Sequence, residues 1–364
     1  MNIKAAVVHS KGSDFHIEDV TLAAPQPGEV LVKIIASGIC HTDIGVQHQE
    51  KPVPLPAILG HEGAGIVEQV GQGVTIFEPG DHVVMSYSSC GKCKQCLNGE
   101  AYGCERAYDV NFAGYMEDRT HRHHQHGKTV SVFFGQSSFA TYSVVSERNL
   151  VKVDKNVPLE QLGPLGCGIQ TGAGTIFNKL KPELGSKLAV FGCGSVGLSA
   201  IMAAKLAGCA QIIGVDIHDN RLELASALGA THTINARAED TKQRLLEITR
   251  VGIDYGVDAS GQPSVLRQAT DSLALGGTVA LVGGTPTDTE VTLNMNKLLF
   301  EKTVTGVVQG NSIPQIFIPK LINLYKNGLF PFDKLISFYK FEDINKAVAD
   351  MNSGKVIKPI VLMS

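Results

Sequence analysis

The sequence lacks a strong excess of charge of either sign. Its 32 Lys and Arg residues nearly balance 35 Asp and Glu residues, so the formal net charge is −3. Proteins that bind nucleic acid or an anionic membrane by electrostatics usually carry a clear positive excess, so no nucleic acid and no membrane surface is expected as a partner.

Membrane-spanning segments and a secretion signal are also missing from the sequence. The uncharged run 188–204 is slightly short for a membrane span and contains three glycines. Lys4 and Lys11 interrupt the N-terminal region, and no apolar stretch of a signal peptide follows them. We therefore expect a cytoplasmic protein, and its 364 residues are enough for about two domains.

The cysteines do not fit the disulfide framework of a small secreted domain. The chain is long, and four of its eight cysteines, Cys90, Cys93, Cys96 and Cys104, lie within fifteen residues. Four thiolates at this spacing predict a closed, tetrahedral zinc site of the structural type. An iron–sulfur cluster is the alternative, but nothing else in the sequence suggests electron transfer, so zinc is favoured.

Residues 188–216 carry the pattern of a dinucleotide-binding unit: strand, glycine turn, helix, strand and acid. Gly192, Gly194 and Gly197 have the spacing G-x-G-x-x-G, and Asp216 follows Gly197 by nineteen residues. The glycines permit a tight turn, approach of a pyrophosphate and close helix packing, and the acid binds a ribose. The helix that begins at Ser195 and Val196 offers free N–H groups to the phosphates.

The remaining pattern predicts a β-rich region followed by a parallel α/β fold. Short strands are expected in the first 150 residues, including one within 133–145, and residues 121–126, which hold four histidines, are expected to form a solvated loop. Strands and helices then alternate, with a helix expected at 264–275, which predicts a doubly wound parallel sheet.

These motifs together resemble the zinc-containing medium-chain alcohol dehydrogenases. The likeness runs nearly end to end and rests on the motifs 38–43, 60–65, 166–172 and 192–197 and on the four-cysteine lobe, 90–104. Within this family, the overall sequence most resembles the bacterial aryl-alcohol (benzyl alcohol) dehydrogenases. The resemblance implies a GroES-like catalytic domain (1–168 and 309–364) and a Rossmann domain (169–308). It also implies that copies of the chain assemble into a homodimer or homotetramer.

The resemblance also implies a second, catalytic zinc held by Cys40, His61 and Cys167, which Glu62 approaches during ligand exchange. The zinc makes the hydroxyl of a small-molecule alcohol more acidic, and the alcohol gives hydride to NAD and becomes an aldehyde. Asp43 orients His61. Thr42 accepts the alcohol's proton, but Gly45 stands where the animal enzymes continue the relay with a histidine, so His41, His48 or solvent remain open as the next acceptor.

For the cofactor, the resemblance adds contacts beyond the glycine loop. Asp216 favours NAD over NADP because its charge repels a 2′-phosphate. The expected contacts to the pyrophosphate, the adenosine ribose, the nicotinamide carboxamide and a phosphate are, in that order, His41, Arg221, the backbone of Val282 and Val307, and Lys358.

Several other functions compete with an aryl-alcohol dehydrogenase. Cys167 argues against polyol and threonine dehydrogenases, which typically have glutamate there, and Tyr108 argues against glutathione-dependent formaldehyde dehydrogenases, which have arginine. Aliphatic alcohols remain possible substrates. A non-catalytic NAD-binding protein is the alternative of a different class, but it would not need Cys40, His61 and Thr42 together.

Overall fold

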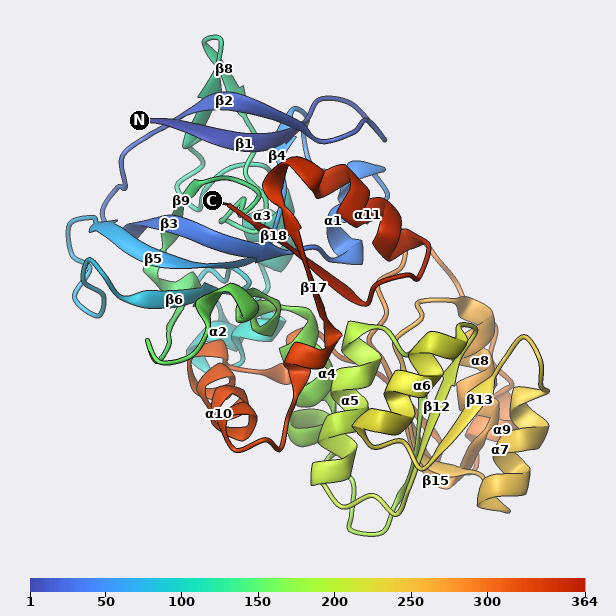
Figure 1. The fold of residues 1–364 in the computed structure, drawn as a ribbon. Coiled ribbons are helices and arrows are strands. Elements are labelled where there is room, and N and C mark those ends of the chain that lie inside the picture. The colour runs from blue at the N-terminus through green and yellow to red at the C-terminus, as the bar shows by residue number, and fades with distance from the viewer. Residues whose placement is uncertain (364) are drawn as a thin grey trace. The chain divides into compact units, whose positions relative to one another are not determined.

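The computed structural model describes residues 1–363 and divides into two compact units (Figure 1). The first unit comprises Met1–Cys167, Ile313–Ile322 and Asp333–Ser364, and the second comprises Gly168–Ser312 and Asn323–Phe332. From the sequence, the second domain was expected to begin at 169 and end at 308. In the structure it also includes the short segment 323–332.

The first unit contains two β-sheets. Its strands are β1 (Asn2–Val8), β2 (His16–Leu22), β3 (Glu29–Gly38), β4 (Ala57–Ile58), β5 (Glu62–Val70), β6 (His82–Met85), β7 (His123–Gln125), β8 (Lys128–Val130), β9 (Tyr142–Ser146), β10 (Leu150–Lys152), β17 (Ile336–Lys340) and β18 (Lys358–Leu362). One sheet has the order β4-β1-β2-β7-β8. The other has the order β10-β6-β5-β3-β18-β17, with β9 also paired to β3.

The first unit also contains short helices. They are α1 (His41–Gln47), α2 (Lys94–Leu97), α3 (Ala107–Phe112) and α11 (Ile344–Asn352). A large apolar core, which includes Val32, Val67, Phe133 and Phe139, fills the space beside the seven-stranded sheet. In β3, Val30 and Val32 face this core, whereas Leu31 between them faces a second apolar core, so the strand is buried on both faces.

The second unit is built on a six-stranded parallel sheet. Its strands are β11 (Lys187–Phe191), β12 (Gln211–Asp216), β13 (His232–Asn235), β14 (Ile253–Asp258), β15 (Leu273–Leu281) and β16 (Thr303–Gly306), in the order β13-β12-β11-β14-β15-β16. The order reverses between β11 and β14, which is the place where such sheets bind ligands beyond the strand ends.

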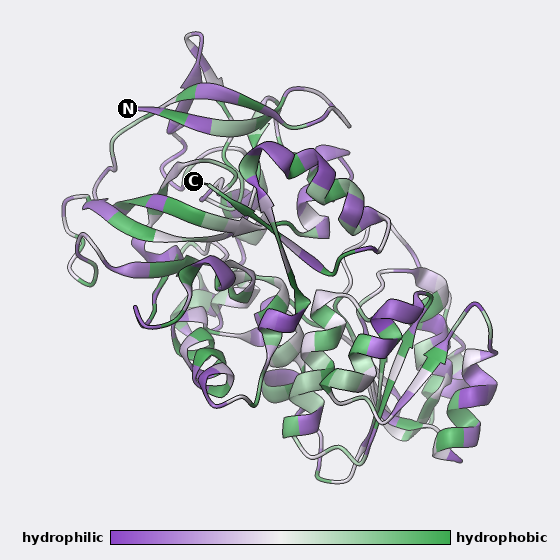
Figure 2. Cartoon of the chain, in the orientation of Figure 1, coloured by the Kyte–Doolittle hydropathy of each residue, from purple (hydrophilic) through white to green (hydrophobic). Residues whose placement is uncertain are grey.

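Helices pack around this parallel sheet. They are α4 (Gly168–Gly174), a π-helical turn (Thr175–Leu180), α5 (Ser195–Leu206), α6 (Asp219–Leu228), α7 (Thr241–Thr249), α8 (Pro263–Asp271) and α9 (Met295–Leu298), while α10 (Pro314–Lys326) is divided between the two units. In Figure 2, α5 is pale to green and α7 is purple and green, because α5 consists mainly of small and apolar residues whereas α7 mixes charged and apolar ones. The parallel fold expected from the sequence is confirmed.

Three local expectations from the sequence are wrong. Residues 121–126 are not a solvated loop, because His123 lies in β7, pairs with Leu22 and is fully buried. The helix expected at 264–275 ends at Asp271, and β15 begins at Leu273 because this residue pairs with Ile253. In the segment 133–145, only the part from β9 onward is a strand.

The start of that segment is a tightly folded loop instead of a strand. Phe134 and Ser137 adopt positive φ angles of 53° and 52°, which no extended strand contains. Among the described residues, no helix is long and apolar enough to cross a membrane.

Candidate active site

Candidate metal ligands from distant parts of the chain meet in the first unit. Cys40 directly precedes α1, His61 directly precedes β5, and Cys167 follows a 3-10 turn, Gly163–Gly166. The ligand atoms of Cys40, His61, Glu62 and Cys167 all lie within 4.8 Å of one another. The fold therefore brings together the set that the family resemblance implied.

Asp43 links two of these ligands from the first turn of α1. Its Oδ1 lies 2.9 Å from Nδ1 of His61 and accepts a hydrogen bond from the backbone N–H of Gly60 at 3.1 Å. Its Oδ2 accepts the backbone N–H of Cys40 at 2.8 Å. Because the carboxylate accepts the proton of Nδ1, the lone pair of the imidazole is left on Nε2.

The residues present fit a bound metal cation. Nε2 of His61 is buried and has no hydrogen-bond partner among the described residues, although buried nitrogens normally have one. A hydrogen bond from Cys167 lowers the pKa of Cys40 well below its ordinary value, against the effect of burial. Burial disfavours a charged His61, yet the charge of Asp43 outweighs it and raises the pKa. The site thus favours positive charge, which a cation would supply in place of protons.

Glu62 and Lys358 form a buried ion pair beside this ligand set. The ammonium of Lys358 lies 2.9 Å from both carboxylate oxygens of Glu62 and 3.0 Å from the carbonyl oxygen of Ile39. Burial lowers the pKa of Lys358, but the attraction of Glu62 outweighs it and raises the pKa above its ordinary value. The side chain of Lys358 is only 2% exposed and its three donors are occupied. The phosphate contact that the resemblance implied for Lys358 stays a prediction.

An aromatic cluster covers the imidazole of His61. The ring of Phe134 lies 4.6 Å from the His61 ring, and Phe133 meets it edge-on at 5.4 Å. Phe112 contacts both phenylalanines at 5.3 and 5.7 Å, and the exposed Tyr108 stacks on Phe112 at 5.2 Å. The cluster therefore extends from the metal ligand to the protein surface.

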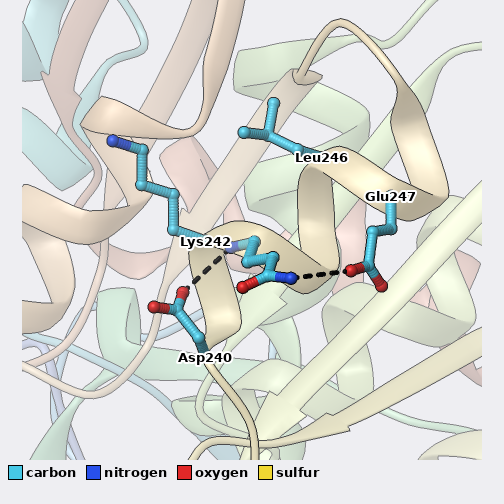
Figure 3. Close-up of a pocket in the computed structure, with 5 residues that line it drawn as sticks. Asp240, Lys242, Leu246 and Glu247 are labelled. Carbon is cyan, nitrogen blue, oxygen red and sulfur yellow. Dashed lines mark hydrogen bonds between the residues drawn. The ribbon is translucent and has the colours of Figure 1, made fainter.

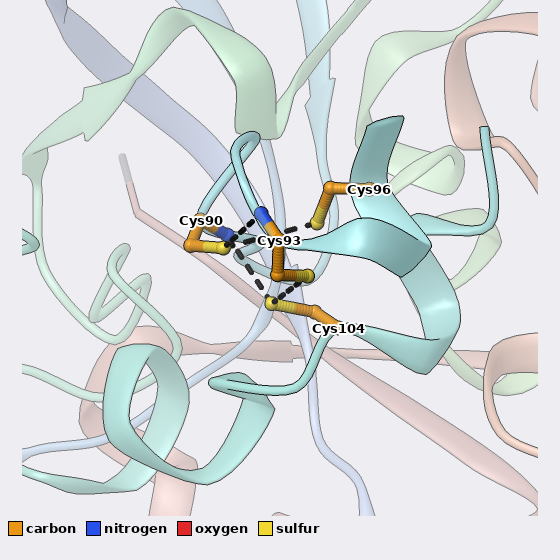
Figure 4. A group of neighbouring side chains, drawn as sticks. All are labelled: Cys90, Cys93, Cys96 and Cys104. Carbon is orange, nitrogen blue, oxygen red and sulfur yellow. Dashed lines mark hydrogen bonds between the residues drawn. The ribbon is translucent and has the colours of Figure 1, made fainter. Parts of the chain in front are cut away.

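The four clustered cysteines of the lobe form a second candidate metal centre (Figure 4). The sulfur atoms of Cys90 and Cys96, and those of Cys93 and Cys104, are 4.0 Å apart. Disulfide sulfurs would be about 2 Å apart, whereas thiolates on one tetrahedral zinc are separated by about 3.8 Å. Backbone N–H groups of Cys96 and Glu105 lower the pKa of Cys93 to about 6. The spacing fits one ion and leaves no room for a cluster of several irons.

In the second unit, the glycine loop has the shape expected for a dinucleotide. Gly192 has a φ of 93°, and a Cβ on Gly197 would lie 1.9 Å from the carbonyl oxygen of Gly192, so neither position accepts a side chain. A Cβ on Gly194 would meet nothing within 4 Å, which leaves open space beside the loop. Ser195 and Val196 begin α5 there, and their backbone N–H groups lie in its first turn.

Asp216 ends β12 beside this loop. Its carboxylate accepts backbone N–H groups of Cys193 at 2.7 Å, Ile217 at 2.7 Å and His218 at 3.0 Å. Arg221 approaches it at 3.8 Å, and Nε of Arg221 is buried with no hydrogen-bond partner among the described residues. The acid is thus held in a fixed orientation at the carboxyl end of its strand.

Two further cofactor candidates occupy the ends of neighbouring strands. The N–H of Val282 donates to Asp258 O at 2.9 Å, and the N–H of Val307 donates to Leu281 O at 3.0 Å. Because these donors are used within the sheet, only the carbonyl groups of the two valines could serve a carboxamide.

His41 and Thr42 occupy the first turn of α1, directly after Cys40. His41 is exposed, Thr42 is half-buried and Gly45 is half-buried. His48 ends the helix six residues beyond Thr42, so about 240° of helical rotation separates the two side chains. The two residues therefore lie on different faces of the helix.

One surface furrow has no relation to these centres. It lies along α7 and is lined by Asp240, Lys242, Gln243, Leu246 and Glu247 (Figure 3). Asp240 caps the helix by accepting the N–H of Gln243 at 2.9 Å, and the Gln243 side chain donates to Glu247 at 3.1 Å. These are ordinary contacts of a solvated helix.

No pattern in the sequence indicated the residues that pack around the segments of the metal ligands. Gln136 bonds to His61 O, Ser86 bonds to Gly166 O, and Phe112 packs on Phe133 and Phe134, but none of the three stands in a motif or beside a ligand in sequence. No local pattern marks them, because their roles arise from strand pairing and loop folding over long sequence separations.

Comparisons with known proteins agree along the whole chain. Residues 26–155 match the family described as alcohol dehydrogenase GroES-like domain, and residues 195–327 match the family described as zinc-binding dehydrogenase. The geraniol dehydrogenase of Castellaniella defragrans is 40% identical over 366 residues, covering 100% of this chain and 98% of the relative.

Two crystal structures are also similar over their full lengths. Benzyl alcohol dehydrogenase from Acinetobacter calcoaceticus is 47% identical with a TM-score of 0.97, covering 100% of both chains. An alcohol dehydrogenase zinc-binding domain protein from Burkholderia ambifaria is 46% identical with a TM-score of 0.97, covering 100% of this chain and 99% of its own. The chain belongs to the zinc-containing medium-chain alcohol dehydrogenases, which use zinc and a nicotinamide cofactor, and it stands close to the aryl-alcohol dehydrogenases.

Proposed function

We propose that this protein reversibly oxidises aromatic primary alcohols of the benzyl type to aldehydes, with NAD as the hydride acceptor. The observation that carries this proposal is the aromatic cluster on His61, in which Phe133 and Phe134 pack against a candidate metal ligand. Both rings are buried in the apolar core, so they give the metal site an apolar aromatic surrounding, which suits an aryl-bearing substrate better than a small polar one. The benzyl alcohol dehydrogenase relative supports the same substrate class.

Two zinc ions per chain fit the two centres. Cys40, His61 and Cys167 would hold the catalytic ion with Glu62 nearby, and the four-cysteine lobe would hold a structural one. When bound in an open site, zinc acts as a Lewis acid that makes an alcohol hydroxyl more acidic. The chain contributes Asp43, which keeps Nε2 of His61 available as a ligand, and the aromatic cluster, which excludes water from that side.

Thr42 is our candidate for the first proton acceptor. It is half-buried and only two residues from Cys40 in α1, which suits a hydroxyl that receives a proton near the metal and passes it outward. His48 points from another face of the helix, so we favour release through the exposed His41 or directly to solvent. The other role proposed for His41 is a contact with the cofactor pyrophosphate.

NAD is favoured over NADP by the fixed carboxylate of Asp216. Three backbone N–H groups hold it at the end of β12, where its charge would oppose a 2′-phosphate. We assign the adenosine ribose to Asp216 and Arg221, the pyrophosphate to the loop 192–197 and the carboxamide to the carbonyls of Val282 and Val307.

A second candidate substrate class is the allylic primary alcohols. The geraniol dehydrogenase relative favours it, because an allylic alcohol, like a benzylic one, carries its hydroxyl on a carbon bonded to an unsaturated carbon. Aliphatic alcohols, the glutathione–formaldehyde adduct and a non-catalytic NAD-binding role remain rivals that one experiment can separate.

The test compares kcat/KM for benzyl alcohol, geraniol, hexanol, ethanol and the glutathione–formaldehyde adduct by the rise in NADH absorbance. We expect benzyl alcohol to exceed hexanol by at least about tenfold, the usual worth of a well-fitted hydrophobic group. A higher value for ethanol or the adduct would overturn the aryl assignment. An enzyme with zinc in both centres but no alcohol-dependent NADH production would overturn the catalytic assignment.

We also propose a cytoplasmic homodimer built on the edge of the parallel sheet, with a homotetramer as the alternative. The edge strand β16 has one neighbour in the sheet, and the nearby Leu299 and Phe300 are 79% and 54% exposed. An open edge next to apolar side chains is a usual template for pairing with a second copy. Sedimentation of the protein and of Phe300→Lys tests this, and an unchanged monomer in both would refute it.

A further inference from the structure

The side chain of Gln136 lies fully buried behind the candidate metal site. Its Nε2 donates to the carbonyl oxygen of His61 at 3.0 Å and to that of Ser86 at 3.1 Å, and its Oε1 accepts the N–H of Gly63 at 3.4 Å. One amide thus binds two backbone groups at the ligand His61 and the nearby Gly63, and one backbone group of the separate segment that contains Ser86.

Ser86 carries this connection onward to another ligand. Its hydroxyl donates to the carbonyl oxygen of Gly166 at 2.7 Å, and Gly166 directly precedes Cys167. The two segments are in close contact here, since a Cβ on Gly166 would lie 1.9 Å from the carbonyl oxygen of Met85. A continuous buried chain therefore runs from His61 through Gln136 and Ser86 to Cys167.

The loop that presents Gln136 is held in an unusual conformation. Phe134 and Ser137, on either side of it, have positive φ angles, which L-residues adopt only where surrounding contacts compensate. Two side-chain hydrogen bonds are among these contacts: the hydroxyl of Ser137 donates to Ile58 O, and that of Ser143 donates to Gln136 O. Strained, over-determined loops of this kind concentrate at functional sites.

We propose that Gln136 and Ser86 are positioning residues that fix His61 relative to Cys167, two ligands 106 residues apart in the sequence. Asp43 does the same for Cys40 and His61, so the two bridges together hold all three protein ligands. Partners of this kind orient ligands that the fold alone holds less accurately. The proposal depends on the metal site but not on the identity of the alcohol.

The test measures the metal itself in three variants of the full protein. Gln136→Met removes the amide at similar volume, Ser86→Ala removes one hydroxyl, and Gln47→Met is the matched control. Gln47 is a buried glutamine in the same unit, but its Nε2 bonds to Ser13 O and contacts no ligand. Each protein is loaded with Co²⁺ in the catalytic site, and its visible spectrum and the rate of metal loss to a chelator are recorded.

We expect Gln136→Met and Ser86→Ala to shift the Co²⁺ absorption bands and to lose metal about 10- to 100-fold faster, the usual effect of removing a partner of a metal ligand. Gln47→Met should match the parent protein in both measurements. Parental spectra and release rates in Gln136→Met and Ser86→Ala would overturn the proposal. If Gln136→Met does not fold, the milder Ser86→Ala decides alone. A parent protein that produces no NADH from alcohols, combined with variants whose cobalt spectra are altered, would refute the proposed activity and still support this inference.

Discussion

The carboxylate of Asp43 lies 2.9 Å from Nδ1 of His61, and both side chains are at most 1% exposed. This single contact fixes which ring nitrogen faces Cys40 and Cys167. It also places a negative charge behind a ligand set that already contains two thiols, so the site attracts a divalent cation.

Replacement of Asp43 by Asn should therefore weaken the catalytic metal site without unfolding the protein. The shape is kept, but the charge behind His61 is lost, and we expect zinc affinity to fall by about 10- to 100-fold. Competition with a fluorescent chelator measures the change. Asp81→Asn is the control, since Asp81 is similarly buried but pairs with Lys152, which is not a candidate ligand. Equal zinc affinities in the two variants would contradict the role of Asp43.

Cys40→Ser should abolish turnover and leave NAD binding nearly unchanged. The substitution removes one thiolate from the candidate catalytic centre, whereas the glycine loop lies in the other unit. Zinc content should fall from about two ions per chain to about one, because the cysteine lobe keeps its own ion. Cys209→Ser, at a half-buried free cysteine of the second unit, should change neither quantity. Full activity in Cys40→Ser would disprove the assignment of Cys40 as a ligand of the catalytic zinc.

Asp216→Ser should relax the preference for NAD. Removal of the fixed charge at the end of β12 makes room for a 2′-phosphate and removes its repulsion, so the ratio of kcat/KM with NAD to that with NADP should fall by about 10- to 100-fold. Asp271→Ser serves as the control, because Asp271 lies at the end of α8 and pairs with Lys297. An unchanged ratio would count against Asp216 as the discriminating residue.

The buried His123 should make stability fall as the pH is lowered. Burial, reinforced by the nearby His124, Arg122 and His121, lowers the pKa of His123 from 6.5 to about 4. Between these values the unfolded chain binds more protons, so unfolding becomes easier as pH falls from 6.5 towards 4 and changes little from this cause below that. The full contribution is about 3 kcal/mol, of which about 1.4 kcal/mol is lost between about pH 7.5 and about pH 5.5.

Urea unfolding of the parent protein and of His123→Leu at those two pH values checks this expectation. The variant lacks the titrating ring, so its stability should depend less steeply on pH by about 1.4 kcal/mol over the interval. Identical pH dependence in the two proteins would show that His123 is not responsible.

The local motifs were readable in the sequence because they describe short backbone geometry. The spacing of Gly192, Gly194 and Gly197 specifies one turn, and the spacing of the lobe cysteines lets four sulfurs reach one point. Both signals act over fewer than thirty residues. The catalytic ligand set was different, since Cys40, His61 and Cys167 could be joined only through resemblance to a family.

Amino-acid order alone thus determined the two-part fold, the dinucleotide turn and the cysteine lobe, because periodicity and spacing encode those features directly. Only the tertiary structure decided that Lys358 binds Glu62, that His123 is buried in a sheet and that Gln136 is connected through Ser86 to the segment of Cys167. These relationships depend on which strands pair and how one strained loop packs. Such long-range contacts leave no repeat or spacing in the chain itself.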